Sequence, residues 1–469
     1  MENEFDIKNF ITERDNVLIA PAGFGKTHTI KECLKHTEGR QLILTHTQAG
    51  VASIKDKLQK ESVSKEKYEV RTIASFTGEY VFSFYHLDDA PDEADDNYYE
   101  FIKNNAIRLF SSKLVQDILK LSYSGIFVDE YQDCNEKQHD LILILASIIP
   151  THILGDPLQG IFNFDKKDKL VDLNNVFQMG RFKKRKELKV PHRWINSGKR
   201  ELGEDILKIR NKLELNLEVD FLDYSSIEFK EGSYNDYYGY IINILKNNKN
   251  VLVIDPVSYS QIISKRFVVA FKYLVSLIES FDNQDFYKFA KLFDNQEDLE
   301  SKEVLHKFIV SIFSNLDNWY DKKNKKFKIK KDSNKEKQLT KIKKIIVELK
   351  SNYSLIGIKN LILEIKNLEG VNCARRDLLN SLIKSIEEAN SLDITVLEAM
   401  RRNRNSMRIV GRKMYGKFIG TTLLTKGLEF DVVIILDVNK FNDCKNLYVA
   451  LSRCTTRLII LGGNNKISF

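Results

Sequence analysis

A glycine-rich segment near the amino end constrains this chain more than any other feature. A helical pattern over roughly residues 27–35 follows the segment, so the order is strand, tight loop, helix. Backbone N–H groups in such a loop form an anion-binding nest at a helix amino end. The sequence therefore predicts a phosphate-binding loop, with a chance Gly-Lys-Thr turn as the alternative. The loop follows the apolar run 17–19 and reads Ala20-Pro21-Ala22-Gly23-Phe24-Gly25-Lys26-Thr27.

Four positions in the loop have specific roles in that prediction. Gly23 and Gly25 allow close backbone approach and φ values that a side chain resists. Lys26 is expected to reach the β- and γ-phosphates, and Thr27 is expected to place its hydroxyl on Mg²⁺. The strict pattern has glycine where Ala20 stands, so the loop alone does not settle the chemistry.

Length and composition bound the class of protein. A chain of 469 residues is long enough for two to four compact units. The formal net charge of +8 suits a polyanionic partner. The five cysteines have no close paired spacing, which predicts a reducing environment and no cysteine metal site. The acidic amino end and the short longest apolar stretch, 141–149, predict a cytoplasmic protein with no membrane contact.

Strand and helix patterns alternate along the chain, which predicts an α/β fold with parallel sheets. The first set lies within 1–200 and includes an acidic stretch of about 78–114, whose most acidic part favours a solvated loop. The second set, 201–263 and 407–469, is divided by a long helical segment, 264–406. The lysine-dense part of that segment, 321–350, suits a solvated helix face or, alternatively, contact with a nucleic-acid backbone.

Two carboxylates follow the apolar strand 126–128. Asp129 at a strand end is suited to hold Mg²⁺, and Glu130 is suited to orient and deprotonate a water molecule. Exposed loop acids are the alternative. Gln159 follows another predicted strand and is placed to sense a γ-phosphate.

Two arginines lie on opposite sides of the helical segment. Phosphoryl-transfer sites gain much of their rate from an arginine brought to the developing negative charge. Arg193 in Pro-His-Arg-Trp and Arg453 in Ala-Leu-Ser-Arg are candidates for this role, with ordinary surface arginines as the alternative.

These segments together resemble a superfamily-1A helicase of the UvrD/Rep/PcrA type. The strongest match is Val-Asp-Glu-x-Gln-Asp, and Lys-Gly-Leu-Glu-Phe-Asp is also matched. The matches follow the family order and lie at 20–27, 44–50, 72–76, 128–133, 155–162, 191–194, 426–431 and 448–453. The resemblance implies two RecA-like P-loop domains with ATP and Mg²⁺ between them, the second domain split by a helical insertion, and a short insertion in the first.

The resemblance also assigns roles to individual residues. It implies catalysis by Glu130, Lys26, Gln159, Arg193 and Arg453, and Mg²⁺ binding by Thr27 and Asp129. The residues implied to contact ATP are Ala22, Gly23, Phe24, Gly25, Lys26, Thr27, His28, His192, Gly427 and Glu429. The residues implied to line a single-stranded DNA path are His46, Thr47, Thr72, Ser75, Phe162, Phe164, Trp194 and Thr422.

The implied activity is an ATP-dependent translocase or helicase on single-stranded DNA, or on a duplex with a single-stranded tail, moving 3′→5′. The family's adenine-reading Gln upstream of the loop is missing, and His28 and His192 stand where Arg and Tyr usually flank the base. The stretch 78–114 is short for the family's first inserted subdomain, which predicts weak strand separation. The alternative is a nucleotide- and DNA-gated ATPase subunit of an antiphage defence complex of the Gabija type, acting with a TOPRIM/OLD-type nuclease partner.

Overall fold

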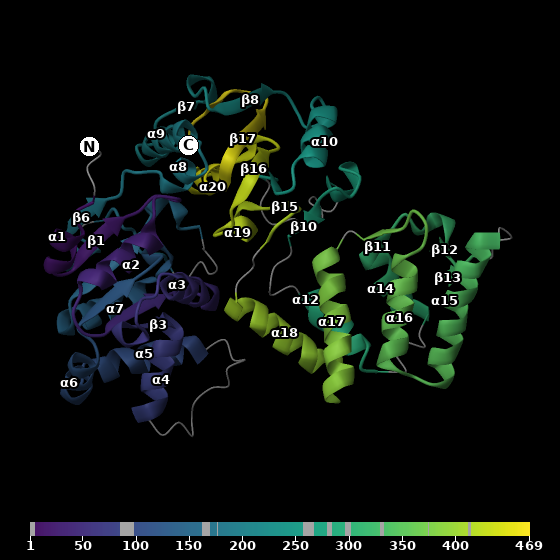
Figure 1. Ribbon diagram of the computed structural model, residues 1–469, viewed down its shortest axis with the longest axis horizontal. Coiled ribbons are helices and arrows are strands. Elements are labelled where there is room, and N and C mark those ends of the chain that lie inside the picture. Colours follow the sequence, from purple (N-terminus) through teal and green to yellow (C-terminus); the bar gives the residue numbers. More distant parts are fainter. Residues whose placement is uncertain are drawn as a thin grey trace.

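The computed structural model describes residues 5–84, 98–161, 169–175, 177–256, 267–278, 284–295, 302–328, 333–373, 375–410 and 414–469. These residues form two six-stranded sheets with helices around them, and a helical lobe to one side (Figure 1). We call the part built on the first sheet, within 5–196, the first unit. The part built on the second sheet, within 200–278 and 414–469, is the second unit, and 284–410 is the helical lobe.

The first sheet has the strand order β3-β2-β4-β5-β1-β6, and all its strands are parallel. Its strands are β1 (Asn16–Ile19), β2 (Gln41–Thr45), β3 (Tyr68–Thr72), β4 (Gly125–Val128), β5 (Thr151–Gly155) and β6 (Lys184–Glu187). The central strands are buried on both faces, because their apolar runs pack against helices on either side. The helices are α1 (Ile7–Thr12), α2 (Lys26–His36), α3 (Gln48–Lys60), α4 (Ile73–Phe84), α5 (Tyr98–Phe110), α6 (Lys113–Ser122), α7 (Glu136–Ile148) and α8 (His192–Asn196).

The described part of the stretch 78–114 packs onto the first unit. Ile102, Ala106 and Phe110 of α5 belong to the same buried cluster as Ile19 of β1 and Val128 of β4. Helix α5 also contacts α4 and α7. These residues therefore extend the core of the first unit, while the acidic tract 88–96 lies outside the described residues.

The second sheet has the order β10-β15-β9-β16-β17-β8 and is also parallel. Its strands are β8 (Ile227–Glu231), β9 (Val251–Ile254), β10 (Ser276–Leu277), β15 (Lys417–Gly420), β16 (Phe430–Ile435) and β17 (Cys454–Gly462). Helices α9 (Arg200–Glu214), α10 (Tyr238–Asn247), α19 (Thr422–Thr425) and α20 (Cys444–Leu451) accompany it, and β7 (Val219–Asp220) pairs with β18 (Lys466–Ile467). Strand β10 joins this sheet, although the sequence prediction placed its residues in the insertion. Its two residues are too short a run to be recognised as a strand.

The helical lobe has a separate core. It contains α12 (Gln284–Leu292), α14 (Lys302–Ile312), α15 (Ser333–Ser351), α16 (Leu355–Lys366), α17 (Arg376–Leu392) and α18 (Val396–Val410), with the short strand pairs β11 (Phe313–Ser314) with β14 (Asn372–Cys373) and β12 (Tyr320–Asp321) with β13 (Lys326–Phe327). Helix α18 reaches back from the lobe and contacts α3 of the first unit (Figure 1). The predicted α/β class, with two parallel sheets and a helical segment interrupting the second, is confirmed.

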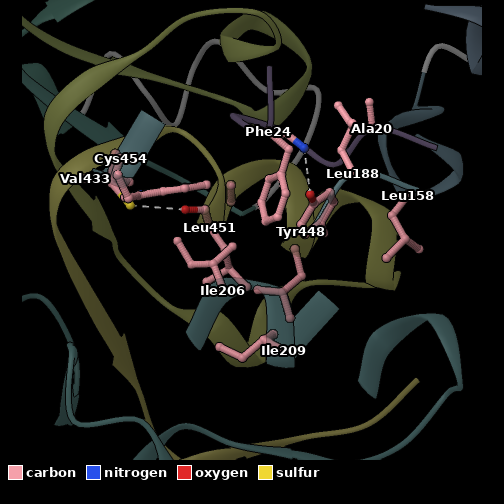
Figure 2. Packing of buried hydrophobic residues seen from close by; sticks show 14 of the residues in the cluster. Ala20, Phe24, Leu158, Leu188, Ile206, Ile209, Val433, Tyr448, Leu451 and Cys454 are labelled. Carbon is pink, nitrogen blue, oxygen red and sulfur yellow. Dashed lines mark hydrogen bonds between the residues drawn. The ribbon is translucent and has the colours of Figure 1, made fainter. Parts of the chain in front are cut away.

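The two sheet units meet through a continuous apolar cluster. Phe24 of the glycine-rich loop and Leu158 of the 3₁₀ turn η3 (Pro157–Gln159) belong to the same cluster as Ile206 of α9 and Leu451 of α20. Figure 2 shows Phe24 beside Tyr448 of α20, with the α9 side chains below them. The packing fixes how the loop faces the second unit. Within the described residues, no helix combines the length and the apolar character needed to cross a bilayer.

Candidate active site

The glycine-rich loop has the backbone that its sequence predicts. Gly23 and Gly25 adopt φ values of +80° and +93°, which side chains resist. Gly25 caps α2, so Lys26 is the first residue of the helix. A Cβ at Gly23 would lie 2.9 Å from Cζ3 of Trp194, because α8 packs directly on the loop. Both glycines are therefore required by conformation, and Gly23 also by close packing.

Lys26 lies against the two carboxylates that follow β4. Its Nζ is 2.7 Å from Oε2 of Glu130 and 3.6 Å from Oδ1 of Asp129. Burial alone would lower the pKa of Lys26, but the Glu130 and Asp129 carboxylates outweigh burial and raise it. The loop and the acids that follow β4 thus lie together at one site.

The two acids differ in their electrostatic environment. Burial raises the pKa of Asp129, and the Lys26 ammonium only partly offsets this. Burial acts on Glu130 in the same direction, but Lys26 and Lys426 outweigh it and lower the pKa of Glu130. Glu130 also accepts a 2.5 Å hydrogen bond from Nε2 of Gln132. Of the two acids, Glu130 is the one held more firmly as a carboxylate, the form that a general base needs.

Arg193 bridges the first and second units. Its backbone N–H donates to the Gly23 carbonyl at 2.9 Å, which fixes α8 on the loop. Its Nη2 lies 2.6 Å from Oε1 of Glu429, and its Nη1 donates to the Ser452 carbonyl at 2.5 Å. The buried Nε has no hydrogen-bond partner among the described residues. Although burial would raise the pKa of Glu429, the Arg193 and Arg453 charges lower it.

Arg453 is a buried cation without a carboxylate in direct contact. Its side chain donates to the Val449 carbonyl at 2.8 Å, the Leu428 carbonyl at 3.3 Å and the Ser452 hydroxyl at 2.8 Å. No ion pair to it occurs in the described part of the chain. Burial and the nearby Arg193 lower the pKa of Arg453 to about 10. A buried guanidinium in this state gains strongly from an anion, since an uncompensated buried charge is costly.

Two further contacts join the units at this site, and neither was assigned a role from the sequence. Lys426 Nζ lies 2.6 Å from Oδ1 of Asp133, and both side chains are almost fully buried. The Ala22 N–H donates to Oη of Tyr448 at 3.0 Å (Figure 2). Lys426, Asp133 and Tyr448 all lie inside recognised motifs, but only the fold reveals that the motifs pair across the junction.

The residues present fit a nucleoside triphosphate with Mg²⁺. The loop supplies an N–H nest, and Lys26, Arg193 and Arg453 supply three cations from both sides of the junction. Mg²⁺ is usually held by one or two carboxylates together with phosphate oxygens, which suits Asp129 and a partly buried Thr27. Among the described residues there is no self-contained cluster of three or more metal-binding side chains.

The remaining nucleotide-site candidates lie around the loop or in the second unit. The His28 and His192 ring centroids are 6.4 Å apart at 50°, and Cδ2 of His192 lies 3.2 Å from the position of a Cβ at Gly25. Gly427 has a φ of +79° with open space around it. Gln159 is buried and donates from Nε2 to Oδ2 of Asp156 at 3.1 Å. In this conformation Gln159 is held by the strand end rather than directed at Lys26.

The DNA-path candidates divide into two sets. His46 and Thr47 lie between β2 and α3, where Thr47 is exposed and caps α3, and His46 Nε2 lies 3.4 Å from Sγ of Cys134. Thr72 and Ser75 hydrogen-bond to each other at 2.9 Å after β3. These residues all lie at the carboxyl ends of neighbouring strands β2 and β3.

The structure does not support a base-stacking role for Trp194. Its ring is fully buried and meets Phe24 edge-on, with centroids 6.2 Å apart. The ring is needed to pack α8 onto the loop, so no face of it is open to a base in this conformation. Thr422 is also buried, and its hydroxyl donates to Oδ1 of Asn446 at 2.8 Å. Phe162 and Phe164 lie outside the described residues.

Comparison with known proteins gives one family match and similar solved structures. A family model described as an AAA domain matches residues 5–165. A crystal structure of Pif1 helicase from Bacteroides in complex with ADP-AlF3 and ssDNA has 15% identity, covers 53% of this chain and 58% of that chain, and has a TM-score of 0.29. A Bacteroides sp Pif1 structure in complex with ADP-AlF4 has 17% identity, coverages of 53% and 57%, and a TM-score of 0.28. Each match thus spans less than two thirds of the Pif1 chain. No curated protein matches.

Proposed function

We propose that this chain is an ATP-dependent translocase on single-stranded DNA, a motor of the UvrD helicase type. The observation that carries the proposal is that Lys26 of the first unit contacts Glu130, whose charge also acts on Arg453 of the second unit, while Arg193 bridges the loop and the second unit. Arg193 binds the loop through its backbone and the second unit through its side chain. An anion bound at the loop therefore interacts with both units, which a motor requires.

Each residue of the site has a chemical role in this proposal. ATP with Mg²⁺ supplies the cleavable phosphoanhydride bond and neutralises part of the phosphate charge. Lys26 and the loop N–H groups hold the phosphates, while Thr27 and Asp129 hold the metal ion. Glu130, held as a carboxylate, orients the attacking water and accepts its proton. Arg193 and Arg453 stabilise the negative charge that develops on the transferred phosphoryl group.

The contacts of Lys26 with the two acids predict how nucleotide and Mg²⁺ affect each other's binding. Lys26 Nζ now lies between Glu130 and Asp129, where it balances their charge. Lys26 would gain new anionic partners in phosphates held at the loop, and Asp129 would gain a new cation on holding Mg²⁺. We therefore expect nucleotide to bind together with Mg²⁺ and to release Lys26 from the two carboxylates.

Movement on DNA follows from differential affinity. A ligand shifts a conformational equilibrium only if it binds the two states differently. When the two units lie together around the phosphates, Arg193 and Arg453 both contact them. This closed arrangement therefore binds nucleotide more tightly than an arrangement with the units apart. DNA held by residues such as Thr47 and Ser75 in the first unit, and by the second unit, would then move as the units approach and separate, 3′→5′ by family analogy.

Paired assays of ATP hydrolysis and strand displacement test this function. We expect hydrolysis to rise on addition of a single-stranded oligonucleotide, and displacement to require a 3′ tail on the duplex. Glu130→Gln should still bind nucleotide, with kcat lowered by about 10²–10⁴-fold because the general base is lost. The matched control is Glu136→Gln, an exposed acid at the start of α7. No hydrolysis by the wild-type protein at any DNA concentration would overturn the proposal.

A second candidate function is an ATPase subunit that senses DNA within an antiphage defence complex and passes the signal to a nuclease partner. The observation that favours it is the packing of α5 into the core of the first unit, which leaves no separate inserted subdomain among its described residues. DNA-stimulated hydrolysis with neither strand displacement nor movement along single-stranded DNA would select this function, whereas movement without displacement would still support the translocase.

A further inference from the structure

A pair of fully buried charges lies at the junction, outside the catalytic residues assigned above. Nη2 of Arg210, on α9, lies 3.1 Å from Oδ1 of Asp156, and neither side chain has any solvent exposure. Arg210 belongs to none of the sequence motifs, whereas Asp156 directly follows β5. Burying two charges costs desolvation free energy unless their remaining hydrogen-bonding groups are satisfied. A fully buried pair is therefore a candidate for a role beyond stability.

Asp156 is the centre of a hydrogen-bond network that leads to the proposed base. Its Oδ2 accepts from Nε2 of Gln159 at 3.1 Å, and its Oδ1 accepts from the Leu158 N–H at 3.3 Å. Its own N–H donates to Oε1 of Gln132 at 3.0 Å, and Gln132 in turn donates to Glu130. The position of Asp156 therefore influences both the γ-phosphate sensor Gln159 and the orientation of the Glu130 carboxylate.

The same pair also reaches the glycine-rich loop through the second unit. Cζ of Arg210 lies 6.0 Å from the ring centroid of Tyr448, and Oη of Tyr448 accepts the Ala22 N–H (Figure 2). Burial and the Asp156 carboxylate both raise the pKa of Tyr448, so its hydroxyl stays protonated and can donate. Helix α20, which carries Tyr448, also contacts α9 and η3.

An arginine suits this position better than a lysine. Besides its contact with Asp156, Arg210 donates from Nη1 to Glu214 at 2.9 Å and to Glu187 of β6 at 3.5 Å. A planar guanidinium can satisfy acids in different directions while its face lies on an aromatic ring. A lysine ammonium keeps the charge but cannot hold this fixed fork. Arg210 therefore ties β6, the end of β5 and α20 to one helix.

We propose that Arg210 is a positioning residue of the nucleotide site. It holds Asp156 in place, and through Asp156 it fixes Gln159, the Gln132–Glu130 contact and the Tyr448–Ala22 contact relative to one another. The inference rests on the proposed ATPase function and adds to it a residue on α9 that couples the two units during turnover. Arg210 touches no reacting atom in this scheme.

The kinetic test is Arg210→Lys, measured as kcat and KM for ATP with single-stranded DNA present. Loss of positioning should lower kcat by about tenfold or more, while KM changes by less than about threefold, because the phosphate-binding groups are intact. The melting temperature should stay near that of the wild-type protein, since the buried charge is kept. A kcat within about twofold of the wild-type value overturns the proposal.

A matched control and a second variant separate positioning from simple charge balance. Arg185→Gln removes an arginine that binds the same Glu214, at 3.2 Å, without touching Asp156, and should leave kcat unchanged. If Arg210→Lys does not fold, the charge-neutral double variant Arg210→Gln with Asp156→Asn replaces it. A folded double variant with low kcat supports positioning. Recovery of wild-type kcat, or failure of the double variant to fold, makes Arg210 merely structural and overturns the proposal.

Hydrogen exchange gives a readout that does not depend on hydrolysis. In Arg210→Lys, amides of 20–27, 156–161 and 444–452 should exchange faster, while those of α17 in the helical lobe should not change. Uniformly faster exchange, or no change at all, contradicts the proposal. If the wild-type protein hydrolyses no ATP, the proposed function fails, but this exchange pattern still decides the role of Arg210.

Discussion

The two sheets have the same size and the same parallel arrangement, but their strand ends carry different chemistry. In the first sheet, β1 leads into the glycine-rich loop and β4 leads into Asp129 and Glu130. In the second sheet, β9 leads into Asp255 and Pro256, and β16 leads toward Asp437, with no glycine-rich loop after either strand. The architecture alone therefore does not make a phosphate site.

The second unit contributes in another way. It places Tyr448 of α20 against the loop of the first unit, it buries Arg453 between α20 and β17, and it binds Arg193 through Glu429 and Ser452. One sheet thus presents the phosphate-binding loop and the acids, while the other presents a buried cation. The comparison teaches that the residues of the proposed active site come from two similar frameworks, and we expect both halves to be needed for activity.

The largest expected effect comes from breaking the half that the first sheet provides. Lys26→Ala should lower ATP hydrolysis by about 10³-fold or more, because the cation that contacts the β- and γ-phosphates is lost. Steady-state phosphate release measures this. Lys35→Ala is the control, since Lys35 lies on the same helix but pairs with Glu32 at the surface. Normal hydrolysis by Lys26→Ala would mean that the nucleotide lies elsewhere.

The next largest effect comes from the half that the second sheet provides. Arg453→Lys keeps a cation but removes the planar fork, and it should lower kcat by about 10³-fold, as for an arginine finger. Arg457→Gln is the control, because Arg457 lies on β17 shortly after Arg453 but binds Glu228 of β8. Equal kcat values for the two variants would mean that Arg453 does not contribute to catalysis and that the first sheet alone supplies the catalytic residues.

A smaller effect concerns how the stability of the two sheet units depends on pH. His152 of β5 lies between Phe10 and Phe127, with centroids 5.0 and 5.2 Å away, and burial lowers its pKa to about 4. The strands of the second sheet contain no histidine. Since the unfolded chain binds a proton near its ordinary pKa and the folded one does not, stability is lost as pH falls from about 6.5 toward 4.

Urea unfolding of the wild-type protein and of His152→Leu at two pH values measures this effect. Between pH 7 and pH 5, the wild-type protein should lose about 2 kcal/mol more unfolding free energy than His152→Leu does. His36→Leu, at an exposed position on α2, should behave like the wild-type protein. Identical pH dependence in all three proteins would show that His152 protonates without cost.

Local features of the site were predictable from the sequence. The strand-loop-helix order fixes the glycine conformations at Gly23 and Gly25, and the acids after β4 lie where a parallel sheet brings strand ends together. Arg193 and Arg453 were found because they belong to motifs. The two-sheet architecture followed from the alternation of strands and helices around one helical segment.

Long-range contacts were not predictable in the same way. Arg210 lies beside the apolar stripe Leu202, Ile206, Ile209 and Leu213 of α9, and no local pattern indicates that it faces Asp156. Trp194 looked like a base-stacking residue, but Gly23 and Gly203 leave room for its ring in the core. In both cases the decisive partner is distant in sequence, so only the fold shows which face the side chain occupies.

The most direct test of the divided site is calorimetric binding of ADP, alone and with aluminium fluoride, to the wild-type protein and to Arg453→Lys. Aluminium fluoride occupies the position of the transferred phosphoryl group, where the second sheet's cation acts. We predict that Arg453→Lys binds ADP as tightly as the wild-type protein does, but loses most of the added affinity for the fluoride complex. Equal affinity of both proteins for that complex would contradict a site completed by the second sheet.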